Sequence, residues 1–251
     1  MNRSAVIVGG NRTPFVKAGT TYAAASNSDL LTAALDGLAA RFGLAGTRMD
    51  EVAGGAVLKH SRDFNLTREA VLGSALDPTT PAVDLQQACA TGLETVVYIA
   101  NQIALGQADT GIGAGVDSAS DAPITVSEPL RRALLKANRA RSVPERLKAL
   151  ATVRPHHLAP VAPQVTEPRT GLSMGEHQAV TTAKWGITRQ AQDELTLASH
   201  RNLAAAWDAG FFDDLVTGYL GVSRDGLLRP DTSMERLSAL KVVFGGPDGK
   251  I

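Results

Sequence analysis

The stretch AVDLQQACATGLETVVYIANQIALG, residues 82–106, changes its apolar period part-way along and therefore decides the fold class. Ala82–Leu85 is a short, mainly apolar run of the length typical of a buried strand. A polar turn follows, and from Ala90 the apolar side chains recur at helical spacing until Gly106, where the helix is predicted to end. These side chains belong to Leu93, Val96, Val97, Ala100, Ile103 and Ala104. Because the helix carries a single charge, Glu94, we expect it to be buried on nearly all sides.

The alternation of strand and helix continues on both sides of this stretch. Further strands are predicted at Ala5–Val8, Val52–Leu58 and Ile112–Val116, and helices at Leu66–Leu76 and Thr188–Ala209. Another helix begins near Ser26–Ser28 and ends at Gly43, with the apolar face Leu30, Leu31, Ala34, Leu35, Leu38 and Phe42. Alternating strands and helices favour an α/β fold, in which helices flank a mostly parallel sheet.

The overall composition excludes several classes of protein. The 251 residues carry 25 basic and 25 acidic side chains, so no net positive field attracts nucleic acid. One cysteine excludes an intramolecular disulfide framework and a four-cysteine zinc site. The apolar run before Asn11 is too short for a signal peptide or a membrane span. We therefore expect a soluble cytoplasmic protein, without a nucleic-acid partner and without membrane contact.

Cys89, the single cysteine, lies between the predicted strand and helix, at or just before the helix N-terminus. Unpaired N–H groups and the positive end of the helix dipole stabilise a thiolate at such a position. A thiol at the start of a buried helix is typical of a covalent nucleophile. A lone cysteine is more often a small buried apolar side chain, so chemistry alone leaves both interpretations open.

Three alternating glycines, Gly111, Gly113 and Gly115, suggest a loop that binds phosphate. They alternate within a predicted strand and do not form the GxGxxG spacing, which favours tight packing instead.

The histidines do not predict a metal site. His156 and His157 are adjacent in a proline-rich stretch without a third ligand, so we expect no bound metal. His177 and His200 fall on predicted helices, and we interpret them as packing or surface residues.

Residues Ala88–Glu94, ACATGLE, resemble the nucleophile segment of the thiolases, a family of acyl-CoA acyltransferases. Four further blocks are similar to thiolase motifs and follow in the same order: Arg12–Phe15, Leu105–Pro123, residues 171–214 and Leu228–Phe244. Residues 154–175, RPHHLAPVAPQVTEPRTGLSMG, are most similar to the thiolase subunits of fatty-acid oxidation complexes. The resemblance implies a thiolase-like layered α/β fold with a long loop domain inserted into it.

The resemblance also implies three segments. Residues 1–118 correspond to the N-terminal α/β core, residues 119–240 to the loop domain, and residues 241–251 to the start of the return to the core. Within the loop domain, residues 131–154 hold eight basic side chains against one acid: Arg131, Arg132, Lys136, Arg139, Arg141, Arg146, Lys148 and Arg154, against Glu145. Three interpretations remain open for this basic stretch. They are a solvated helix face, a surface for the CoA phosphates or a partner subunit, and, least expected, a contact with an anionic membrane.

The activity that the resemblance implies is cleavage of a 3-ketoacyl-CoA, or the reverse Claisen condensation. Cys89 attacks the keto carbon, acetyl-CoA leaves, and free CoA takes up the acyl group. Arg229 matches a family position near the CoA nucleotide and Phe244 one near the pantetheine, while Ser173 and Met174 stand at the Met-Gly site. CoA is a substrate here, so no separate cofactor is expected. The implied partners are acyl-CoA, CoA, further copies in a homodimer or homotetramer, and a fatty-acid oxidation complex.

Thiolases have two similar halves, and the second carries a Gly-His motif and a Cys-x-Gly motif. The histidine activates the nucleophile, and the second cysteine acts as acid and base. Neither motif occurs in these 251 residues, so we interpret the chain as an N-terminal part that is inactive alone. Two alternatives remain: a non-catalytic subunit for CoA binding or assembly, and a ketoacyl synthase-like condensing enzyme. The similarity to the thiolase loop domain disfavours the second.

Overall fold

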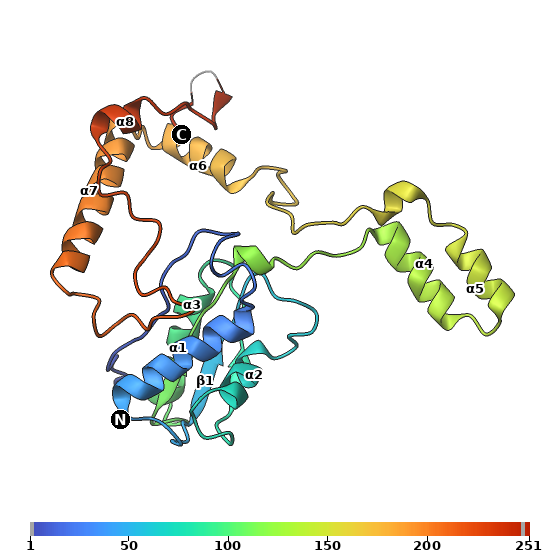
Figure 1. Cartoon of the computed structure of the whole chain (residues 1–251), viewed down its shortest axis with the longest axis horizontal. Helices are drawn as coiled ribbons and strands as arrows, with labels where there is room; N and C mark the ends of the chain where they lie inside the picture. Colours follow the sequence, from blue (N-terminus) through green and yellow to red (C-terminus); the bar gives the residue numbers. More distant parts are fainter. Residues whose placement is uncertain (1–2, 247–248) are drawn as a thin grey trace. The chain divides into compact units, whose positions relative to one another are not determined.

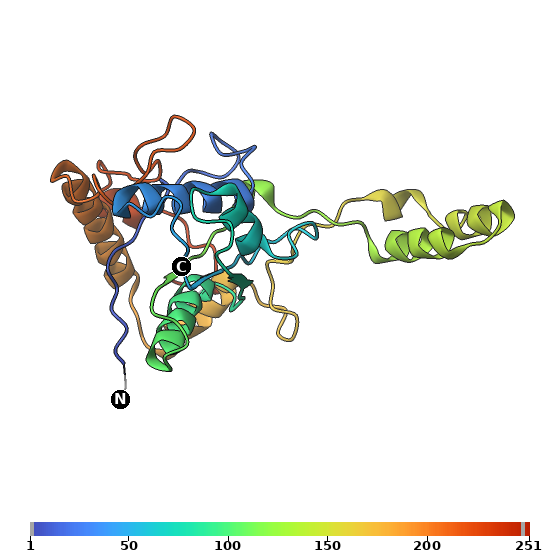
Figure 2. The same ribbon diagram turned by 90° about the horizontal axis from the view of Figure 1, so that it is seen from below.

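The computed structural model describes residues 3–246 and 249–251 and divides the chain into two compact units. Unit 1 comprises Met1–Asp121 and Val165–Ile251, and unit 2 comprises Ala122–Gln164. Figure 1 shows the helices and strands in the colours of the sequence, and Figure 2 shows them from a second direction. Unit 1 holds the sheet and the segment around Cys89, whereas unit 2 holds a pair of short helices.

A three-stranded parallel sheet forms the centre of unit 1. Its strands are β1 (Glu51–Gly54), β2 (Ala82–Asp84) and β3 (Gly111–Gly113), in the order β2-β1-β3. In the register of the sheet, Val52 is paired with Ala82 on one side and with Ile112 on the other. Because the three strands run in the same direction, the residues that follow them meet at one edge of the sheet. The predicted α/β fold with a parallel sheet is confirmed.

Helices α1 (Asn27–Phe42) and α2 (Leu66–Gly73) lie side by side and cover one face of this sheet (Figure 1). Local signals fix both ends of α1, because Ser26 and Asp29 form a capping box and Gly43 ends the helix with φ 65°. The core that joins both helices to the sheet consists of Leu31, Leu35, Ala39, Met49, Val52, Ala56, Leu66, Ala70, Val71, Leu76 and Ile112. Helix α1 therefore begins and ends where the sequence predicts.

Helix α3 (Thr91–Ala104) packs on the opposite face of the sheet. Side chains alternate along a strand, so Ile112 enters the core under α1 and α2 while Gly111 and Gly113 face α3. A Cβ atom at Gly113 would lie only 2.8 Å from the Cα atom of Val96. Strand β3 and helix α3 are thus in backbone contact, which confirms the packing interpretation of these glycines.

The prediction that α3 is buried on nearly all sides is wrong for the part of the chain that the structure describes. Thr91, Thr95 and Ile99 are buried, but Leu93 is 69% exposed and Val97 is 42% exposed. Within residues 3–246 and 249–251, α3 packs against β1 and β3 on one side only. Apolar periodicity identifies a face that avoids water, yet it does not show whether the same chain covers that face.

The buried strand predicted at Ala5–Val8 is wrong as well. Residues 3–10 form no regular secondary structure, and the side chains of Val6, Ile7 and Val8 are 77–82% exposed. Together with β3, α1 and α3, this segment lines a largely apolar cavity of about 1220 Å³. A β-prone sequence becomes a strand only where its backbone pairs with a neighbouring edge, and residues 3–10 make no such pairing.

The C-terminal part of unit 1 holds α6 (Met174–Lys184), α7 (Arg189–Asp208) and α8 (Met234–Ser238). Thr188 caps α7, which begins within one residue of the predicted start. The buried carboxylate of Asp225 accepts two hydrogen bonds of 2.7 Å from Arg12, one from the Phe15 N–H and one from the Trp207 indole. Burial by itself would raise the pKa of Asp225, but the bonds from Arg12 and Phe15 outweigh it and hold the pKa below its usual value.

Unit 2 consists mainly of α4 (Glu128–Arg139) and α5 (Val143–Leu150), followed by the 3-10 helix η2 (Pro155–Leu158). Another 3-10 helix, η1 (Ala119–Asp121), ends the first part of unit 1. Ala133 and Ala137 of α4 and Ala149 of α5 are buried where these two helices pack together. The segments 1–118, 119–240 and 241–251 remain a prediction. Among the described residues, no helix combines the length and the apolar content that crossing a membrane requires.

Candidate functional site

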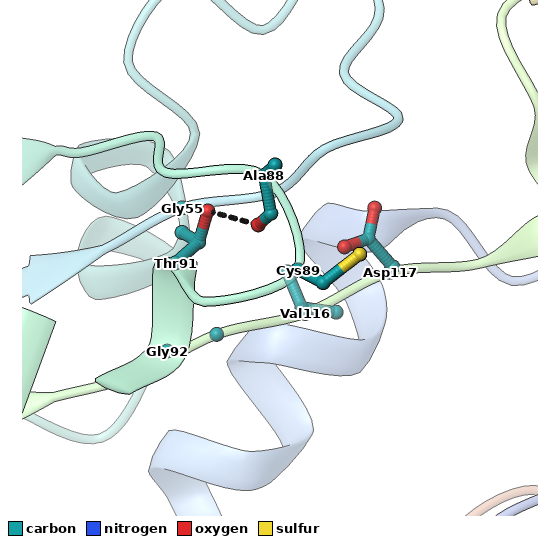
Figure 3. Close-up of a pocket in the computed structure, with 8 residues that line it drawn as sticks. Gly55, Ala88, Cys89, Thr91, Gly92, Val116 and Asp117 are labelled. Atoms are coloured by element: carbon teal, nitrogen blue, oxygen red, sulfur yellow. Dashed lines mark hydrogen bonds between the residues drawn. The ribbon is translucent and has the colours of Figure 1, made fainter. Parts of the chain in front are cut away.

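Cys89 lies in the wall of a cavity of about 290 Å³ at the carboxyl edge of the sheet (Figure 3). The cavity is lined by Gly55, Ala88, Cys89, Thr91, Gly92, Gly115, Val116 and Asp117. Gly55 follows β1, Cys89 follows β2 and Asp117 follows β3, so the parallel sheet brings the three segments together. The Cys89 side chain is exposed, and the interpretation of this thiol as a buried structural cysteine is therefore wrong.

Thr91 fixes the turn that holds Cys89. Its hydroxyl accepts a hydrogen bond from the Gln87 N–H at 2.9 Å and donates one to the Ala88 carbonyl at 2.7 Å, the dashed line in Figure 3. Ala88 has φ 46°, in the left-handed region, which costs a residue with a Cβ atom about 1–2 kcal/mol. The Thr91 hydroxyl thus stabilises a strained turn that presents Cys89 to the cavity.

The backbone around Cys89 offers an unused donor. Cys89 directly precedes Ala90, the N-cap residue of α3, which has no side chain that can cap the helix. The N–H groups of Ala90 and Thr91 are bonded to the carbonyls of Gln87 and Ala88. In the described ranges 3–246 and 249–251, the Cys89 N–H donates to no protein acceptor. A free N–H at a helix start stabilises a negative charge, either a thiolate or the oxyanion of a tetrahedral intermediate.

Close backbone contacts form the walls of the cavity. A Cβ atom at Gly115 would lie 3.0 Å from the Cα atom of Gly92, so the start of α3 touches the segment after β3. At Gly55, the Leu85 carbonyl occupies the space of a side chain. Main chain forms much of the wall, so few side chains reach the cavity. Among these side chains, Cys89 carries the strongest nucleophile.

Asp117 is a site residue that the sequence analysis did not identify. Its carboxylate accepts hydrogen bonds from the N–H groups of Val57 at 3.0 Å and Leu58 at 2.7 Å, which fixes the loop after β1. Asp117 lines the cavity, and in Figure 3 the Cys89 sulfur points toward it. The available signal was an acidic residue just after a predicted strand, at the edge where the residues that follow parallel strands meet.

A second carboxylate near this edge, Asp84, is fully engaged in structural contacts. It accepts from Lys59 at 2.6 Å and from the N–H groups of Leu66 at 3.0 Å and Thr67 at 2.8 Å. Burial alone would raise the pKa of Asp84, but the hydrogen bonds from Lys59 and Thr67 outweigh it and lower the pKa. Asp84 therefore stays ionised and holds the start of α2, which makes it unsuitable as a proton donor.

The residues predicted to contact CoA lie outside the Cys89 cavity. Ser173 caps α6, and Met174, the first residue of that helix, is 73% exposed. The Phe244 ring occupies the space that a Cβ atom at Gly175 would fill. The structure therefore brings Ser173, Met174 and Phe244 together, as a common binding site requires. Their contact with CoA remains a prediction.

Arg229, the fourth residue of this set, is linked to α7 because its N–H donates to Nδ1 of His200 at 3.3 Å. Its contact with CoA also remains a prediction. His177 on α6 bonds to a threonine hydroxyl at 3.1 Å. The rings of residues 156–157, in unit 2, stack edge to face with centroids 4.2 Å apart. Each of these histidines has a local partner that accounts for its position.

Comparisons with known proteins place the chain in a family. Residues 5–251 match the family model described as "Thiolase, N-terminal domain". The chain is 36% identical over 252 residues to the 3-ketoacyl-CoA thiolases of Yersinia pestis (strain Pestoides F) and Yersinia pseudotuberculosis serotype O:3 (strain YPIII). These alignments cover 98% of this chain and 58% of each relative, so the chain spans less than two-thirds of their length.

A solved structure shows the same fold. The crystal structure of the Bacillus anthracis acetyl-CoA acetyltransferase matches with a TM-score of 0.79 and 24% sequence identity, over 100% of this chain and 61% of that one. The thiolase-like layered α/β fold that the sequence predicts is confirmed.

Proposed function

Because the chain belongs to the thiolase family, we propose that Cys89 is the nucleophile of a thiolase-type acyltransferase that cleaves 3-ketoacyl-CoA. The observation that carries this proposal is an exposed thiol in a cavity at the start of α3, beside a backbone N–H without an acceptor among the described residues. The relatives that share 36% of the residues carry the name 3-ketoacyl-CoA thiolase, which supports this substrate class.

In the proposed reaction, the Cys89 thiolate attacks the 3-keto carbon of the substrate. The bond between C2 and C3 breaks, its electron pair becomes the enolate of acetyl-CoA, and protonation of that enolate completes acetyl-CoA. The remaining acyl group is a thioester on Cys89. The thiolate of a second CoA attacks this thioester, forms the shortened acyl-CoA and regenerates the Cys89 thiolate. The reverse sequence is a Claisen condensation.

The chain's own groups perform four tasks in this scheme. Cys89 forms the covalent bond, and its free N–H donates to the oxyanion that develops during each attack. Thr91 keeps the turn in one conformation, so the thiol and the N–H approach the same carbonyl group. Ser173, Met174 and Phe244 supply a surface for the pantetheine, and Arg229 one for the nucleotide of CoA.

The proposal also covers the metabolic role, the location and the assembly of the enzyme. We further propose that the enzyme degrades fatty acids and is cytoplasmic; the resemblance of residues 154–175 to subunits of oxidation complexes and the name 3-ketoacyl-CoA thiolase of the relatives support the degradative role. A homodimer or homotetramer is the assembly that the family implies. The acid and base that move protons belong to the Gly-His and Cys-x-Gly motifs of the second thiolase half.

The decisive experiment uses the complete protein with acetoacetyl-CoA, a longer 3-ketoacyl-CoA and free CoA. Cys89→Ala should abolish turnover and the acetyl adduct that mass spectrometry detects on the peptide around residue 89. Binding of CoA by the variant should persist, since the residues proposed for CoA lie elsewhere. Turnover that survives in Cys89→Ala would refute the proposed nucleophile. CoA binding by the complete wild type without any turnover would favour the non-catalytic subunit instead.

The 251 residues alone should show no thiolytic activity. General acid–base groups are worth about 10²–10⁴-fold each, and the two motifs that carry them in thiolases do not occur in these 251 residues. The pure 251-residue polypeptide is assayed with acetoacetyl-CoA and CoA, beside the complete protein as a positive control. Turnover by the polypeptide that depends on Cys89 would mean that the second half is dispensable.

A further inference from the structure

Two side chains hold the loop after β1 by acting on the same residue, Leu58. The Leu58 N–H donates to the Asp117 carboxylate at 2.7 Å, and the Leu58 carbonyl accepts from the side-chain amide of Asn27 at 2.7 Å. The neighbouring Val57 N–H also donates to Asp117, at 3.0 Å. Because Val57 and Leu58 lie in a loop, these side chains supply partners that a helix or a strand would provide from its own backbone.

This loop forms one wall of the cavity that contains Cys89. It begins at Gly55, a lining residue whose carbonyl accepts from the Val116 N–H at 3.1 Å. Asp117 lines the cavity as well, and the Cys89 sulfur points toward it (Figure 3). The hydrogen bonds from the loop to Asp117 therefore join two walls of one cavity, the segment after β1 and the segment after β3.

Asn27 holds the loop although its own burial destabilises the chain. It is the first residue of α1 and is 2% exposed. In the part of the chain that the structure describes, its Oδ1 atom has no hydrogen-bond partner. Burial of an unsatisfied acceptor destabilises a folded chain, and an apolar side chain would avoid this loss. The contact that distinguishes Asn27 from an apolar residue is its bond to the Leu58 carbonyl.

A second aspartate makes the same kind of contact at the opposite edge of the sheet. Asp50 precedes β1, and its carboxylate accepts from the N–H groups of Asp109 at 2.7 Å and Thr110 at 3.0 Å, just before β3. Asp50 and Asp117 thus tie the segments around β1 to those around β3 at both ends. Because β1 and β3 are parallel, only Asp117 lies at the edge that holds Cys89.

We propose that Asp117 is a positioning residue of the Cys89 site and that Asn27 supports it from α1. Together they keep the loop after β1 in one conformation, so the cavity keeps the width in which an acyl group meets the thiol. Asp117 touches no reacting atom and acts through the backbone of the loop. A displacement of 1 Å at a positioned group can reduce turnover about 10²-fold. The effect on turnover rests on the proposed function, whereas the effect on access to the thiol does not.

The first test compares two reagents for the thiol in the 251-residue chain, which has no other cysteine. Iodoacetamide is small enough to reach an exposed thiol, whereas fluorescein maleimide needs a wider cavity. The ratio of the maleimide rate to the iodoacetamide rate therefore reports the opening of the loop, and a change in the thiolate fraction cancels in it. Asp117→Asn removes hydrogen bonds to a charged acceptor, so the ratio should rise about tenfold or more. Asn27→Ala should also raise it, with the Asp117 charge still in place.

The second test measures cleavage of 3-ketoacyl-CoA by the complete protein. Asp117→Asn should lower kcat about 10–100-fold, because the loop no longer holds one wall of the cavity in place. The KM for CoA should stay unchanged, since the residues proposed for CoA lie elsewhere. Asp117→Glu keeps the carboxylate and should retain more turnover than Asp117→Asn.

The matched control is Asp50→Asn. It removes the bonds of a carboxylate to two backbone N–H groups, as Asp117→Asn does, and should lower the urea midpoint by a similar amount. The alkylation ratio and the kcat of the folded control should equal those of the wild type. Circular dichroism identifies the folded variants, and if Asp117→Asn does not fold, Asn27→Ala and Asp117→Glu decide.

Two results overturn the proposal. The first is an unchanged alkylation ratio in the folded Asp117 and Asn27 variants. The second is an equal rise of the ratio in Asp50→Asn, which would show a general loosening of the fold. A complete wild-type protein without turnover would refute the proposed function instead, and the alkylation ratio would then still decide whether Asp117 positions the cavity wall.

Discussion

Ala88 has a left-handed backbone conformation, φ 46°, directly before the thiol. Glycine adopts this conformation without the Cβ clash, so Ala88→Gly should stabilise the folded chain by about 0.5–1 kcal/mol, after allowance for the entropy gained by the unfolded chain. Turnover by the complete protein should fall, because the freed turn no longer holds Cys89 in one orientation. Urea denaturation measures the first effect and kcat the second. The control is Ala100→Gly, inside α3, which should lower the free energy of unfolding by about 1 kcal/mol. If Ala88→Gly destabilises the chain instead, the turn is not strained.

The second prediction for a single residue concerns Asp225, its contribution to stability and the pH dependence of that contribution. Asp225→Asn leaves the Arg12 guanidinium without its buried carboxylate and should cost about 3 kcal/mol near neutral pH. Since the folded state lowers the pKa of Asp225, its contribution is complete above the unfolded value of about 3.9 and is lost as the pH falls through the folded value. Denaturation midpoints of wild type and variant should therefore converge in acid. The control, Asp208→Asn, removes an exposed ion pair and should lower the free energy of unfolding by less than about 1 kcal/mol. Equal losses of stability in the two variants would contradict the claim that burial makes the Asp225 pair important.

The site was only partly predictable at this scale. Cys89 could be identified because strand, turn and helix are local patterns and the chain has one thiol. The left-handed Ala88 could not, since most alanines avoid that region and only the closed turn with Thr91 imposes it. Asp117 was also missed, because its partners Val57 and Leu58 lie about 60 positions earlier in the chain.

At the scale of elements, the most specific prediction concerns the contact between α3 and β3. Gly113→Ala adds a methyl group 2.8 Å from the Val96 backbone, so α3 must move away from the sheet. The substitution should cost about 1–3 kcal/mol and change the rate at which Cys89 is alkylated. Gly73→Ala is the control: its Cβ would meet only Thr32, at 3.6 Å, and a helix-favouring residue there should be neutral or stabilising. Unchanged stability and alkylation in Gly113→Ala would mean that α3 adjusts freely.

Elements are predicted accurately where the interactions that form them join neighbouring residues, and poorly where they depend on distant segments. Helix α1 was predicted to its ends because Ser26 and Gly43 act on neighbouring residues. The strand at Ala5–Val8 was wrong because strand formation depends on an edge supplied by a distant segment. Helix α3 was placed correctly, but its burial depends on what covers its outer face.

At the scale of the whole molecule, the exposed face of α3 should control self-association. Leu93 is 69% exposed beside the half-exposed Val97, so the 251-residue chain should associate or aggregate at micromolar concentration. Leu93→Gln should reduce this association, whereas Leu195→Gln on α7, which removes a leucine that is 73% exposed, should reduce it less. Light scattering and analytical ultracentrifugation measure both. A wild-type chain that stays monodisperse and monomeric would show that the exposed apolar face of α3 does not cause association.

The unpaired segment at residues 3–10 has one more consequence, for storage and handling. The outer edge of β3 is free of a neighbouring strand within the described residues, and Val6, Ile7 and Val8 are exposed on the same chain. Each molecule thus carries both an acceptor edge and a donor segment, the two ends of a head-to-tail exchange between copies. Where the rotation between copies does not close, such an exchange produces filaments that lengthen with concentration, whereas reciprocal exchange between two copies stops at a dimer. A short peptide with the sequence SAVIVG would occupy the acceptor edge and terminate the growing filament.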